Sequence, residues 1–490
     1  MRIKHRPANS TLIFSALFHL AFLQLATAQK IVITLDAPSN GITVTKAPLK
    51  YNKDFAYSLT LDDCFAGHYS VAYQMFKGGK LDDGQTYPGM FQTDGCGNNL
   101  PFKGGVAWNT VNPTYIDVHT GNVFFYMTWP QLDEMYVAGW DVFNHSYSHR
   151  AIATSPNMSA GDYPDEIKNN ADAVRARTVQ HIEMTHFVVP SGDTNYYKPV
   201  HAFGINKIYN QDYRLPGHFG LNVSAPLDLN NFYLYRGNID ATPIDHSPME
   251  DIATKSVGGN HFWYNEFIHA INSPAAAYPN AVDFSAFKTY MSYIENTYGA
   301  KGADKVWFAP LQEVYEYLAL RDATSLTVKS EGAMVTVDLG FLPVPIGLRH
   351  KALTLAVNST VNFGNVQVSG ARLISFKGSG DRKVINLEFD TLHEKVTVVS
   401  GTSSLMIDKA LKVYPNPVGQ DLFVQTPQEY MGKIADFQIV DMSGRKVYEK
   451  HNVSILQGVI SLDVSGLAVH QTYIINMKAG ELNCHATFSK

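Results

Sequence analysis

The stretch FAYSLTLDD, at residues 55–63, decides how the largest part of this sequence is read. Its residues alternate in polarity up to Leu61, which predicts a β-strand that delivers two acids, Asp62 and Asp63, at its C-terminal end. Neighbouring side chains on an extended chain point to opposite sides, but both can reach one pocket where the backbone turns. One carboxylate can then bind a metal while the other holds a proton. The alternative, a solvated turn, is the commoner role of a bare Asp-Asp pair.

The pattern around this stretch predicts three parts. Strand and helix signals alternate over residues 30–322, which favours an α/β layer or barrel arrangement, and we expect one domain at residues 29–322. Short alternating strands separated by glycine turns predict a small all-β sandwich at residues 323–402. A linker at residues 403–410 then precedes a second small β-sandwich at residues 411–490.

Composition excludes several classes of protein. The chain has 490 residues, enough for about three domains. Its net charge of −5, from 39 basic and 44 acidic residues, argues against a nucleic-acid-binding protein. Three cysteines in a chain of this length exclude a disulfide scaffold.

The first 28 residues are predicted to be a secretory signal peptide. Arg2, Lys4 and Arg6 precede an apolar run at residues 12–25, and Ala26-Thr27-Ala28 is a small-x-small cleavage site. A membrane anchor is the alternative, but the run is shorter than the ~20 apolar residues that a span needs. No later segment is long and apolar enough to cross a membrane. We therefore expect export to an oxidising compartment.

A second motif, HSYSH at residues 145–149, supplies two imidazoles. The i, i+4 spacing predicts that His145 and His149 lie on one face of a helical turn and share an ion, although such a spacing also arises by chance among 18 histidines. Together with Asp63 they would make three protein ligands and leave one position open, as in catalytic zinc sites. Asp62, next to a ligand, would then take the proton from water.

These two motifs resemble those of the polysaccharide deacetylases, a family of metal-dependent carbohydrate esterases. TLDDC at residues 60–64 is similar to the family's TFDDG, and GWDVFNHSYSH at residues 139–149 is similar to its second motif, with Phe124-Phe125 in the preceding strand. Over about residues 50–320, the resemblance implies a distorted (β/α) barrel. It also implies that Asp62 is the catalytic base and that Asp63, His145 and His149 bind one divalent ion, expected to be zinc.

The third and fourth family motifs are altered here. In VVPSG, residues 188–192, Val188 stands where the family has an arginine that orients the base. Pro190 and Gly192 of this motif are retained, and we expect them to contact substrate. The Asp-Trp motif that tunes the acid histidine is not recognisable, and Asp240 and Asp245 are its weak candidates.

The fifth family motif ends in Leu-x-His, and Phe267-Ile268-His269 is similar to it. By this resemblance His269 protonates the leaving group. The alternatives are that His269 is a histidine of a surface loop or helix, and that His261 takes the role instead.

Cysteines and tryptophans near these motifs suggest further roles. Cys64 and Cys96 can form a disulfide that anchors a long loop beside the metal, while a redox or metal role for Cys64 is the weaker alternative. Trp263, Trp129 and Trp140 can stack on sugar rings, and we expect Trp263 to bind substrate. Packing in the core is the competing interpretation for each of them.

The C-terminal part resembles the sorting domain of the type IX secretion system. Three landmarks fall in order: YPNP at residues 414–417, DMSGR at residues 441–445 and a final strand with YIINM at residues 473–477. The resemblance implies that type IX machinery carries the protein through the periplasm and across the outer membrane. Cys484 would leave with the sorting domain if it is removed. The alternative is a generic binding sandwich, and residues 323–402 either bind glycan or act as a spacer.

These observations predict a secreted or cell-surface hydrolase that removes N- or O-acetyl groups from a glycan. Metal-bound water would attack, with Asp62 as the base. Two alternatives remain at this point: a catalytically silent glycan-binding protein on the same fold, favoured by Val188, and a metal-dependent amidase that acts on a non-glycan substrate.

Overall fold

A computed structural model provides the structure of the protein. It describes residues 29–39, 41–111, 119, 125–155, 158–211, 220–228, 232–277, 280–341, 347–389, 409–414, 418–426, 433–441, 445–455, 459–469, 471–479 and 482–490. Several sequence predictions lie outside these residues: the signal peptide at residues 1–28, Phe124, most of the linker, and parts of the sorting motifs at residues 415–417 and 442–444.

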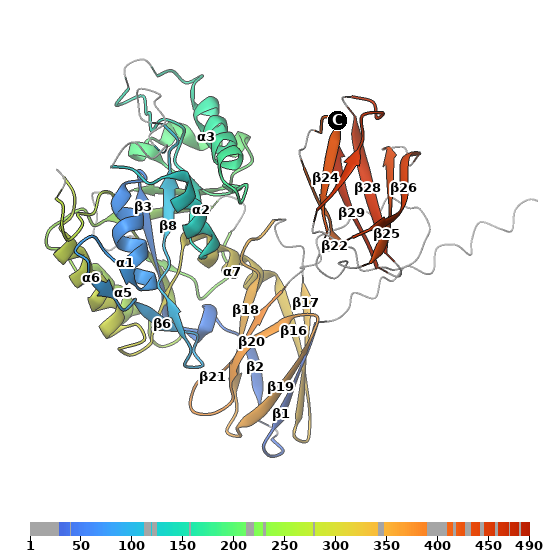
Figure 1. The fold of residues 1–490 in the computed structure, drawn as a ribbon. Helices are drawn as coiled ribbons and strands as arrows, with labels where there is room; N and C mark the ends of the chain where they lie inside the picture. Colours follow the sequence, from blue (N-terminus) through green and yellow to red (C-terminus); the bar gives the residue numbers. More distant parts are fainter. Residues whose placement is uncertain are drawn as a thin grey trace, which may run out of the picture. The chain divides into compact units, whose positions relative to one another are not determined.

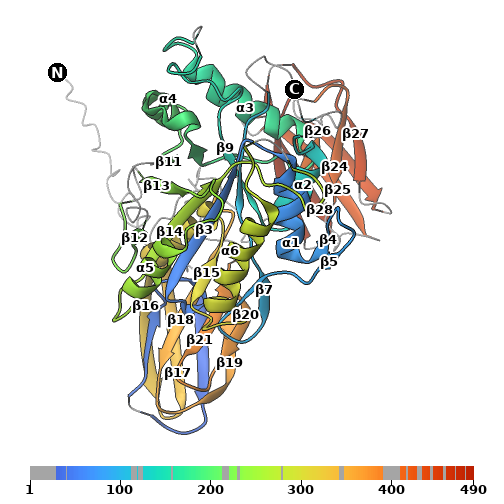
Figure 2. The same cartoon turned by 90° about the vertical axis from the view of Figure 1, so that its left-hand side faces the viewer.

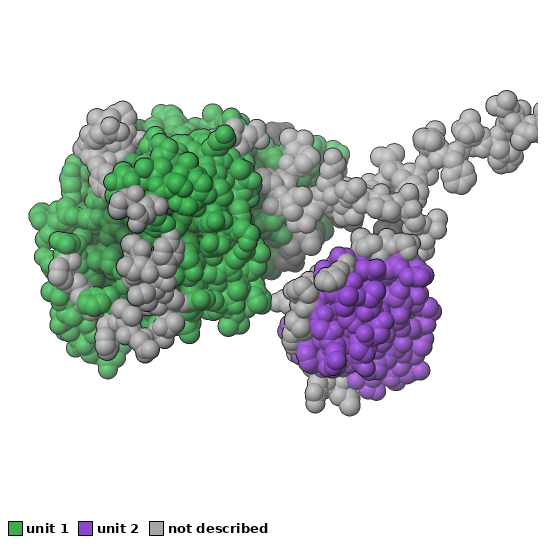
Figure 3. Space-filling model, turned by 90° about the horizontal axis from the view of Figure 1, so that it is seen from above, with its two compact units in different colours: residues 1–396 green, residues 397–490 purple. Residues whose placement is uncertain are grey.

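The chain divides into two compact units, residues 1–396 and residues 397–490 (Figure 3). The first contains the residues of the two acidic and histidine motifs. It combines helices with several sheets, which confirms the mixed α/β class. Within the described residues, no helix is both long and apolar enough to cross a membrane.

A nine-stranded sheet is the framework of the first unit (Figures 1 and 2). Its strands, in spatial order, are β12 (Gly220–Asn222), β14 (Phe262–Ile268), β13 (Phe232–Asn238), β11 (Lys207–Gln211), β10 (Phe187–Val188), β9 (Asp141–Asn144), β8 (Gly105–Trp108), β3 (Phe55–Asp62) and β15 (Val306–Phe308). All neighbouring strands are parallel except β12. Since β14 also pairs with β3, the strands from β14 to β3 form a closed ring. β12 and β15 pair with β14 and β3, respectively.

Helices surround this ring. They are α1 (Gln74–Lys77), α2 (Trp129–Val137), α3 (Tyr163–Arg177), α4 (Tyr197–Ala202), α5 (Ser247–Lys255), α6 (Phe284–Thr297) and α7 (Leu311–Ala323). A π-helix, η2 (His68–Tyr73), precedes α1, and single 3₁₀ turns lie at η1 (Lys50–Asn52), η3 (Pro190–Gly192) and η4 (Thr194–Tyr196). Two small hairpins complete this part: β4 (Gly79–Lys80) with β5 (Thr86–Tyr87), and β6 (Phe91–Thr93) with β7 (Asn99–Pro101).

The alternation in β3 explains how the strand places its acids. Tyr57, Leu59 and Leu61 belong to the same buried cluster as residues of α1, α2 and α6. Small residues, such as Ala56, face the other way, toward a second cluster that includes residues of α7. Because side chains alternate along a strand, Asp62 continues the second series and turns into the ring at the C-terminal end of β3.

Two four-stranded sheets that share one buried cluster form the rest of the first unit. One has the order β16 (Thr324–Glu331), β17 (Met334–Phe341), β1 (Gln29–Leu35) and β19 (Phe363–Ser369). The other has the order β2 (Thr43–Lys46), β18 (Ala352–Asn358), β21 (Lys383–Glu388) and β20 (Arg372–Lys377).

The predicted boundary at residue 29 is therefore wrong. β1 lies between β17 and β19, and β2 pairs with β18, so the first strands of the predicted catalytic domain belong to the all-β part instead (Figure 1, blue strands among orange). Burial drives this pairing, since Ile31 and Ile33 are fully buried between strands that lie about 300 residues away in the chain.

The second unit contains two antiparallel sheets around a buried cluster. One comprises β22 (Lys409–Ala410), β29 (Leu482–Ser489), β28 (Thr472–Ala479), β25 (Ile434–Asp441) and β26 (Lys446–Ser454), with β22 as its one parallel strand. The other comprises β23 (Lys412–Tyr414), β24 (Asp421–Gln425) and β27 (Val459–Asp463). Because β22 pairs with β29, the last two residues of the predicted linker are a strand of this unit.

Candidate metal centre and active site

Asp63 lies directly after β3, where the chain leaves the ring. Asp63 and Cys64 both have positive φ, 72° and 58°, so the backbone reverses sharply at this point. Cys64 contributes its carbonyl to a hydrogen bond from the amide of Met127 (2.8 Å), which holds the turn. The turn directs the Asp63 carboxylate to the C-terminal edge of the ring, beside the loop that follows β9.

That loop contains His145 and His149, and it is not helical. Ser146 and His149 have positive φ, 64° and 53°, so the helical turn expected from the i, i+4 spacing is wrong. The loop nevertheless brings the two rings to within 4.8 Å of each other between centroids. Side chains of α3 hold it in place: Glu166 accepts hydrogen bonds from the Ser148 amide (2.8 Å) and hydroxyl (2.6 Å).

Asp63, His145 and His149 offer three ligand atoms within 4.8 Å of one another. Oδ1 of Asp63 is 3.3 Å from Nε2 of each histidine. Two ligands bound at about 2.0–2.1 Å to a tetrahedral zinc ion lie about 3.3 Å apart, so these separations fit such an ion. The polarity of the site fits as well, because Asp63 Oδ1 and His145 Nε2 are buried and have no hydrogen-bond partner among the described residues.

The tautomer of His145 is set by its other nitrogen. Nδ1 donates to the carbonyl oxygen of Val188 (2.9 Å). In the neutral ring the lone pair is then on Nε2, the nitrogen that lies toward Asp63. For His149, burial lowers the pKa, although the Asp63 carboxylate raises it, so the ring is neutral near pH 7. Burial would raise the pKa of Asp63, but His149, His145 and His269 hold it well below its ordinary value. Asp63 and His149 are thus in the protonation state that a metal requires.

Asp62 is held by an arginine that the sequence motifs did not predict. The Arg236 guanidinium donates from Nη1 to Oδ1 (2.8 Å) and from Nη2 to Oδ2 (3.0 Å) of Asp62. Both side chains are inaccessible to solvent, 0% and 1% exposed. Arg236 comes from β13 and lies over the Phe267 ring at 4.5 Å. A bidentate pair of this kind fixes the carboxylate plane, so Asp62 has one orientation.

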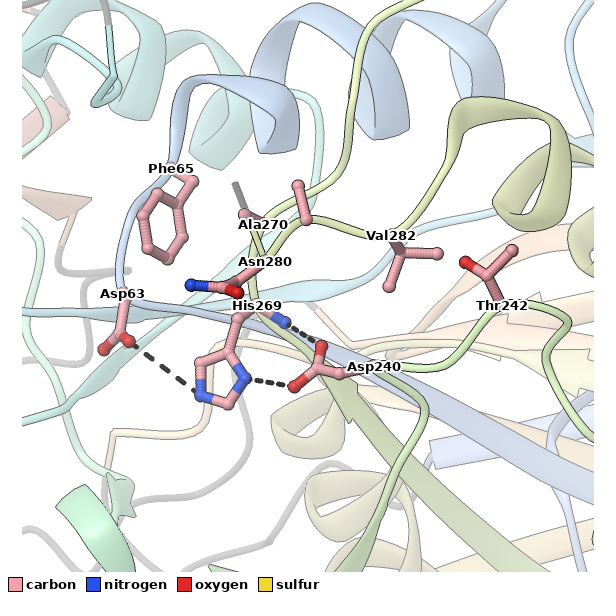
Figure 4. Close-up of a pocket in the computed structure, with 9 residues that line it drawn as sticks. Asp63, Phe65, Asp240, Thr242, His269, Ala270, Asn280 and Val282 are labelled. Carbon is pink, nitrogen blue, oxygen red and sulfur yellow. Dashed lines mark hydrogen bonds and ion pairs between the residues drawn. The ribbon is translucent and has the colours of Figure 1, made fainter. Parts of the chain in front are cut away.

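His269 follows β14 and lies between two carboxylates (Figure 4). Its Nδ1 pairs with Asp240, whose other oxygen accepts from the His269 amide (2.8 Å), and its Nε2 is 3.9 Å from Asp63 Oδ2. Burial lowers the pKa of His269, but the hydrogen bond to Asp240 and the charges of Asp63 and Asp62 raise it to about 9. Asp240, one of two weak candidates for the fourth motif, thus orients this ring.

Other predicted residues make contacts outside the cluster of Asp63, His145 and His149. His261 precedes β14, at the opposite end of the strand from His269, and its Nδ1 is 2.9 Å from the Asp54 carbonyl. Asp245 accepts from the amide and hydroxyl of Ser247 at the start of α5. Pro190 and Gly192 form the 3₁₀ turn after β10, and neither lines the cavity described below.

Two predictions are wrong. Trp263 is fully buried, donates from Nε1 to the Ser58 hydroxyl (3.0 Å) and stacks on Phe232 (5.8 Å), so its ring packs inside the ring of strands and cannot contact a substrate. Cys64 and Cys96 are free thiols. Their surroundings differ: the Asn109 amide donates to Cys64 Sγ (3.4 Å), next to Asp63, whereas the Asn386 side chain of β21 donates to Cys96 Sγ (3.6 Å).

A cavity of about 630 Å³ opens beside Asp63 and His269 (Figure 4). Its lining consists of Asp63, Phe65, Asp240, Thr242, His269, Ala270, Asn280, Ala281 and Val282. Neither Arg236 nor the lining residues outside the motifs belong to a recognisable sequence motif. The available clue to Arg236 was its position, since a charged residue at an inward position of an alternating strand needs a buried partner.

The comparisons with known proteins agree with the resemblance in the motifs. A family model described as polysaccharide deacetylase matches residues 108–202, which include His145 and His149. A second, described as secretion system C-terminal sorting domain, matches residues 412–487. No curated protein matches the sequence.

Solved deacetylase structures share low similarity with this chain. A Streptococcus pyogenes deacetylase, PplD, in complex with acetate is 15% identical, with a TM-score of 0.24, over 36% of this chain and 62% of that one, less than two thirds of its length. The deacetylase domain of BpsB from Bordetella bronchiseptica is 16% identical, with a TM-score of 0.23, over 37% and 72%. The Bc1960 peptidoglycan N-acetylglucosamine deacetylase is 8% identical, with a TM-score of 0.28, over 54% and 92%. From the family models, the chain contains a polysaccharide deacetylase domain and a secretion system C-terminal sorting domain.

Proposed function

We propose that the protein is a secreted, metal-dependent deacetylase that removes N- or O-acetyl groups from a glycan. The observation that carries this proposal is the convergence of the Asp63, His145 and His149 ligand atoms with the Arg236-held carboxylate of Asp62 and with His269. We further propose that the ring of strands is a distorted (β/α) barrel of the deacetylase type. The all-β parts of the two units are then two β-sandwiches.

Asp63, His145 and His149 would hold one divalent ion, and their nitrogen and oxygen donors favour zinc. When bound, such an ion acts as a Lewis acid that polarises the acetyl carbonyl and lowers the pKa of water. Asp62, fixed by Arg236, accepts the proton from the attacking water. His269, oriented by Asp240, donates a proton to the departing amine or alkoxide.

Arg236 supports an active enzyme over a silent binding protein. The absence of an arginine at Val188 favoured the silent alternative, because a base without its guanidinium is poorly oriented. Here Arg236 makes that contact from β13. Export fits the predicted signal peptide and the sorting domain, and we propose that type IX machinery delivers the protein to the cell surface or beyond.

Acetate release from partly acetylated oligosaccharides tests the proposal. We expect Asp62→Asn to lower kcat by about 10²–10⁴-fold, because the amide cannot accept the proton. Asp245→Asn is the matched control: it makes the same change at an acid that accepts hydrogen bonds from the amide and hydroxyl of Ser247, and we expect wild-type rates. Absence of acetate release by the wild type from any acetylated glycan would overturn the proposal. Release from acylated peptides or small amides in that case would favour an amidase.

A further inference from the structure

The cavity beside Asp63 is larger than an acetyl group requires. Its volume of about 630 Å³ lies within the range of ligand pockets that enclose a whole small molecule. Asp63, Asp240 and His269 account for one side of it, and no role has been given to Phe65, Asn280 and the other residues of its remaining wall (Figure 4). The cavity therefore has room for more of a substrate than its acetyl group.

Phe65 is a rigid aromatic wall two residues after Asp63. The amide of Ala66 donates to the Phe125 carbonyl (2.8 Å), and Phe65 forms an isolated antiparallel bridge with Tyr126. The rings of Phe65 and Tyr126 are stacked, with centroids 5.6 Å apart and planes inclined by 15°. One face of the Phe65 ring is thus covered by Tyr126, and its side chain lines the cavity.

The lining also offers an uncommitted polar group. Asn280 has a positive φ of 61°, and its amide points toward Asp63 and His269 (Figure 4). Within the described part of the chain, Asn280 makes no hydrogen bond. Apart from Asp63, Asp240 and His269, the described residues of the lining are uncharged. An aromatic wall, a free amide and no basic side chain beyond His269 suit a neutral sugar better than an anionic one.

We propose that Phe65 and Asn280 form a subsite for the neutral pyranose ring that carries the acetyl group. The C–H face of the sugar stacks on the face of Phe65 opposite Tyr126, and a ring hydroxyl hydrogen-bonds to the Asn280 amide. The subsite holds the sugar so that its acetyl group lies at Asp63 and its leaving atom faces His269. This inference rests on the proposed deacetylase function and names the substrate unit it recognises.

Binding and turnover test the subsite separately. For binding, the turnover-deficient Asp62→Asn protein is titrated with tetra-N-acetylchitotetraose and with acetylated xylotetraose. Adding Phe65→Leu is expected to raise Kd about tenfold for whichever probe the protein binds, whereas Phe65→Tyr keeps the ring and the affinity. Asn280→Ala is expected to weaken binding severalfold. Phe203→Leu, at an exposed phenylalanine outside the cavity, is the matched control and is expected to have no effect.

For turnover, the same Phe65 variants are placed in the active chain and compared on acetylated oligosaccharide and on trifluoroethyl acetate, which has no ring. Phe65→Leu is expected to raise KM about tenfold on the oligosaccharide and to affect trifluoroethyl acetate hydrolysis much less, because that substrate has no ring to stack on the side chain. Equal losses on both substrates, or oligosaccharide binding that is absent or indifferent to Phe65→Leu, would overturn the subsite. Phe65-dependent binding without any acetate release would instead overturn the proposed function and leave the subsite standing.

Discussion

Asp62 and Arg236 place a carboxylate and a guanidinium group in the interior, where neither is accessible to solvent. A buried charge is tolerated only when it is paired, and breaking a buried pair costs about 3–5 kcal/mol. In the proposed mechanism the same contact fixes the lone pairs that accept the proton. Arg236 is thus a positioning residue that acts on the reaction through Asp62.

We expect Arg236→Met to lower acetate release by at least about 100-fold and to destabilise the first unit. Arg236→Lys, which keeps the charge but loses the bidentate contact, should recover part of the activity. A double-mutant cycle with Asp62→Asn separates positioning from general damage, since Arg236→Met should cost little further activity when Asp62 is already neutral. Additive losses in the cycle would contradict the role.

Local motifs predicted the residues that converge at the candidate metal site, but not the arginine that holds Asp62. Asp63, His145 and His149 follow strand ends within two short motifs, so neighbours in the sequence reveal them. Arg236 is 174 residues from Asp62 in the chain, and only the closure of the ring by β14 brings β13 near β3. Trp263 shows the same limit, because alternation cannot say which face of a strand is the interior.

At the scale of elements, the two faces of strand β14 have different roles. One face contributes to the candidate active site, and the other belongs to the buried interior. Phe267 faces inward beneath Arg236, whereas Glu266 faces outward and is fully buried. Three tyrosine hydroxyls donate to Glu266: Tyr57 (2.6 Å), Tyr264 (2.6 Å) and Tyr290 (2.8 Å). Burial, with a smaller contribution from Asp245, outweighs these hydrogen bonds and raises the pKa of Glu266 to about 7.

This shift predicts a pH dependence of stability. The folded chain binds the Glu266 proton more tightly than the unfolded chain, so the stabilisation is complete below about pH 4.5 and is lost as the pH rises through about 7. The free energy of unfolding that is lost over this pH range is on the order of 3 kcal/mol. Unfolding followed by tryptophan fluorescence reports the first unit selectively, because all five tryptophans lie between residues 108 and 307. Between pH 5 and pH 8, wild type should lose stability relative to Glu266→Gln, and a constant difference would refute the linkage.

The loop after β9 shows why an element can be mispredicted while its residues are placed together. The spacing of His145 and His149 fits a helical turn, but Ser146 and His149 adopt left-handed conformations. Glu166 and Asn170 of α3 satisfy the loop and the end of β9 through hydrogen bonds that the sequence pattern does not display. The proximity of the two imidazoles therefore has a tertiary cause.

At the scale of the whole first unit, residues of the all-β part bind the start of β9, the strand that leads to His145. Arg349 and His350, in the turn before β18, both reach the fully buried Asp141 at the start of β9. Arg349 also donates to the Trp140 carbonyl (2.7 Å) and lies over the Tyr136 ring at 3.5 Å. The all-β part is thus a structural support of the site, which neither of the two roles considered from the sequence included.

We expect Arg349→Ala to destabilise the first unit by about 3 kcal/mol, because it leaves the buried Asp141 short of a partner. The matched control is Arg372→Ala, at an arginine of β20 whose ion pair with Glu388 is largely exposed, and it should cost less than about 1 kcal/mol. Equal midpoints for the two variants in denaturant unfolding would contradict a supporting role. The sequence boundary at residue 29 missed this arrangement, because β1 and β2 find their partners only after the chain returns some 300 residues later.

The central claim is that Asp63, His145 and His149 hold a metal on which deacetylation depends. The most direct measurement is the rate of acetate release from an acetylated oligosaccharide by chelator-treated protein as zinc is added back. The rate should be negligible without metal, rise to a plateau at about one equivalent, and stay negligible throughout for Asp63→Asn. An undiminished rate in protein stripped of metal, or a full response in Asp63→Asn, would contradict the account.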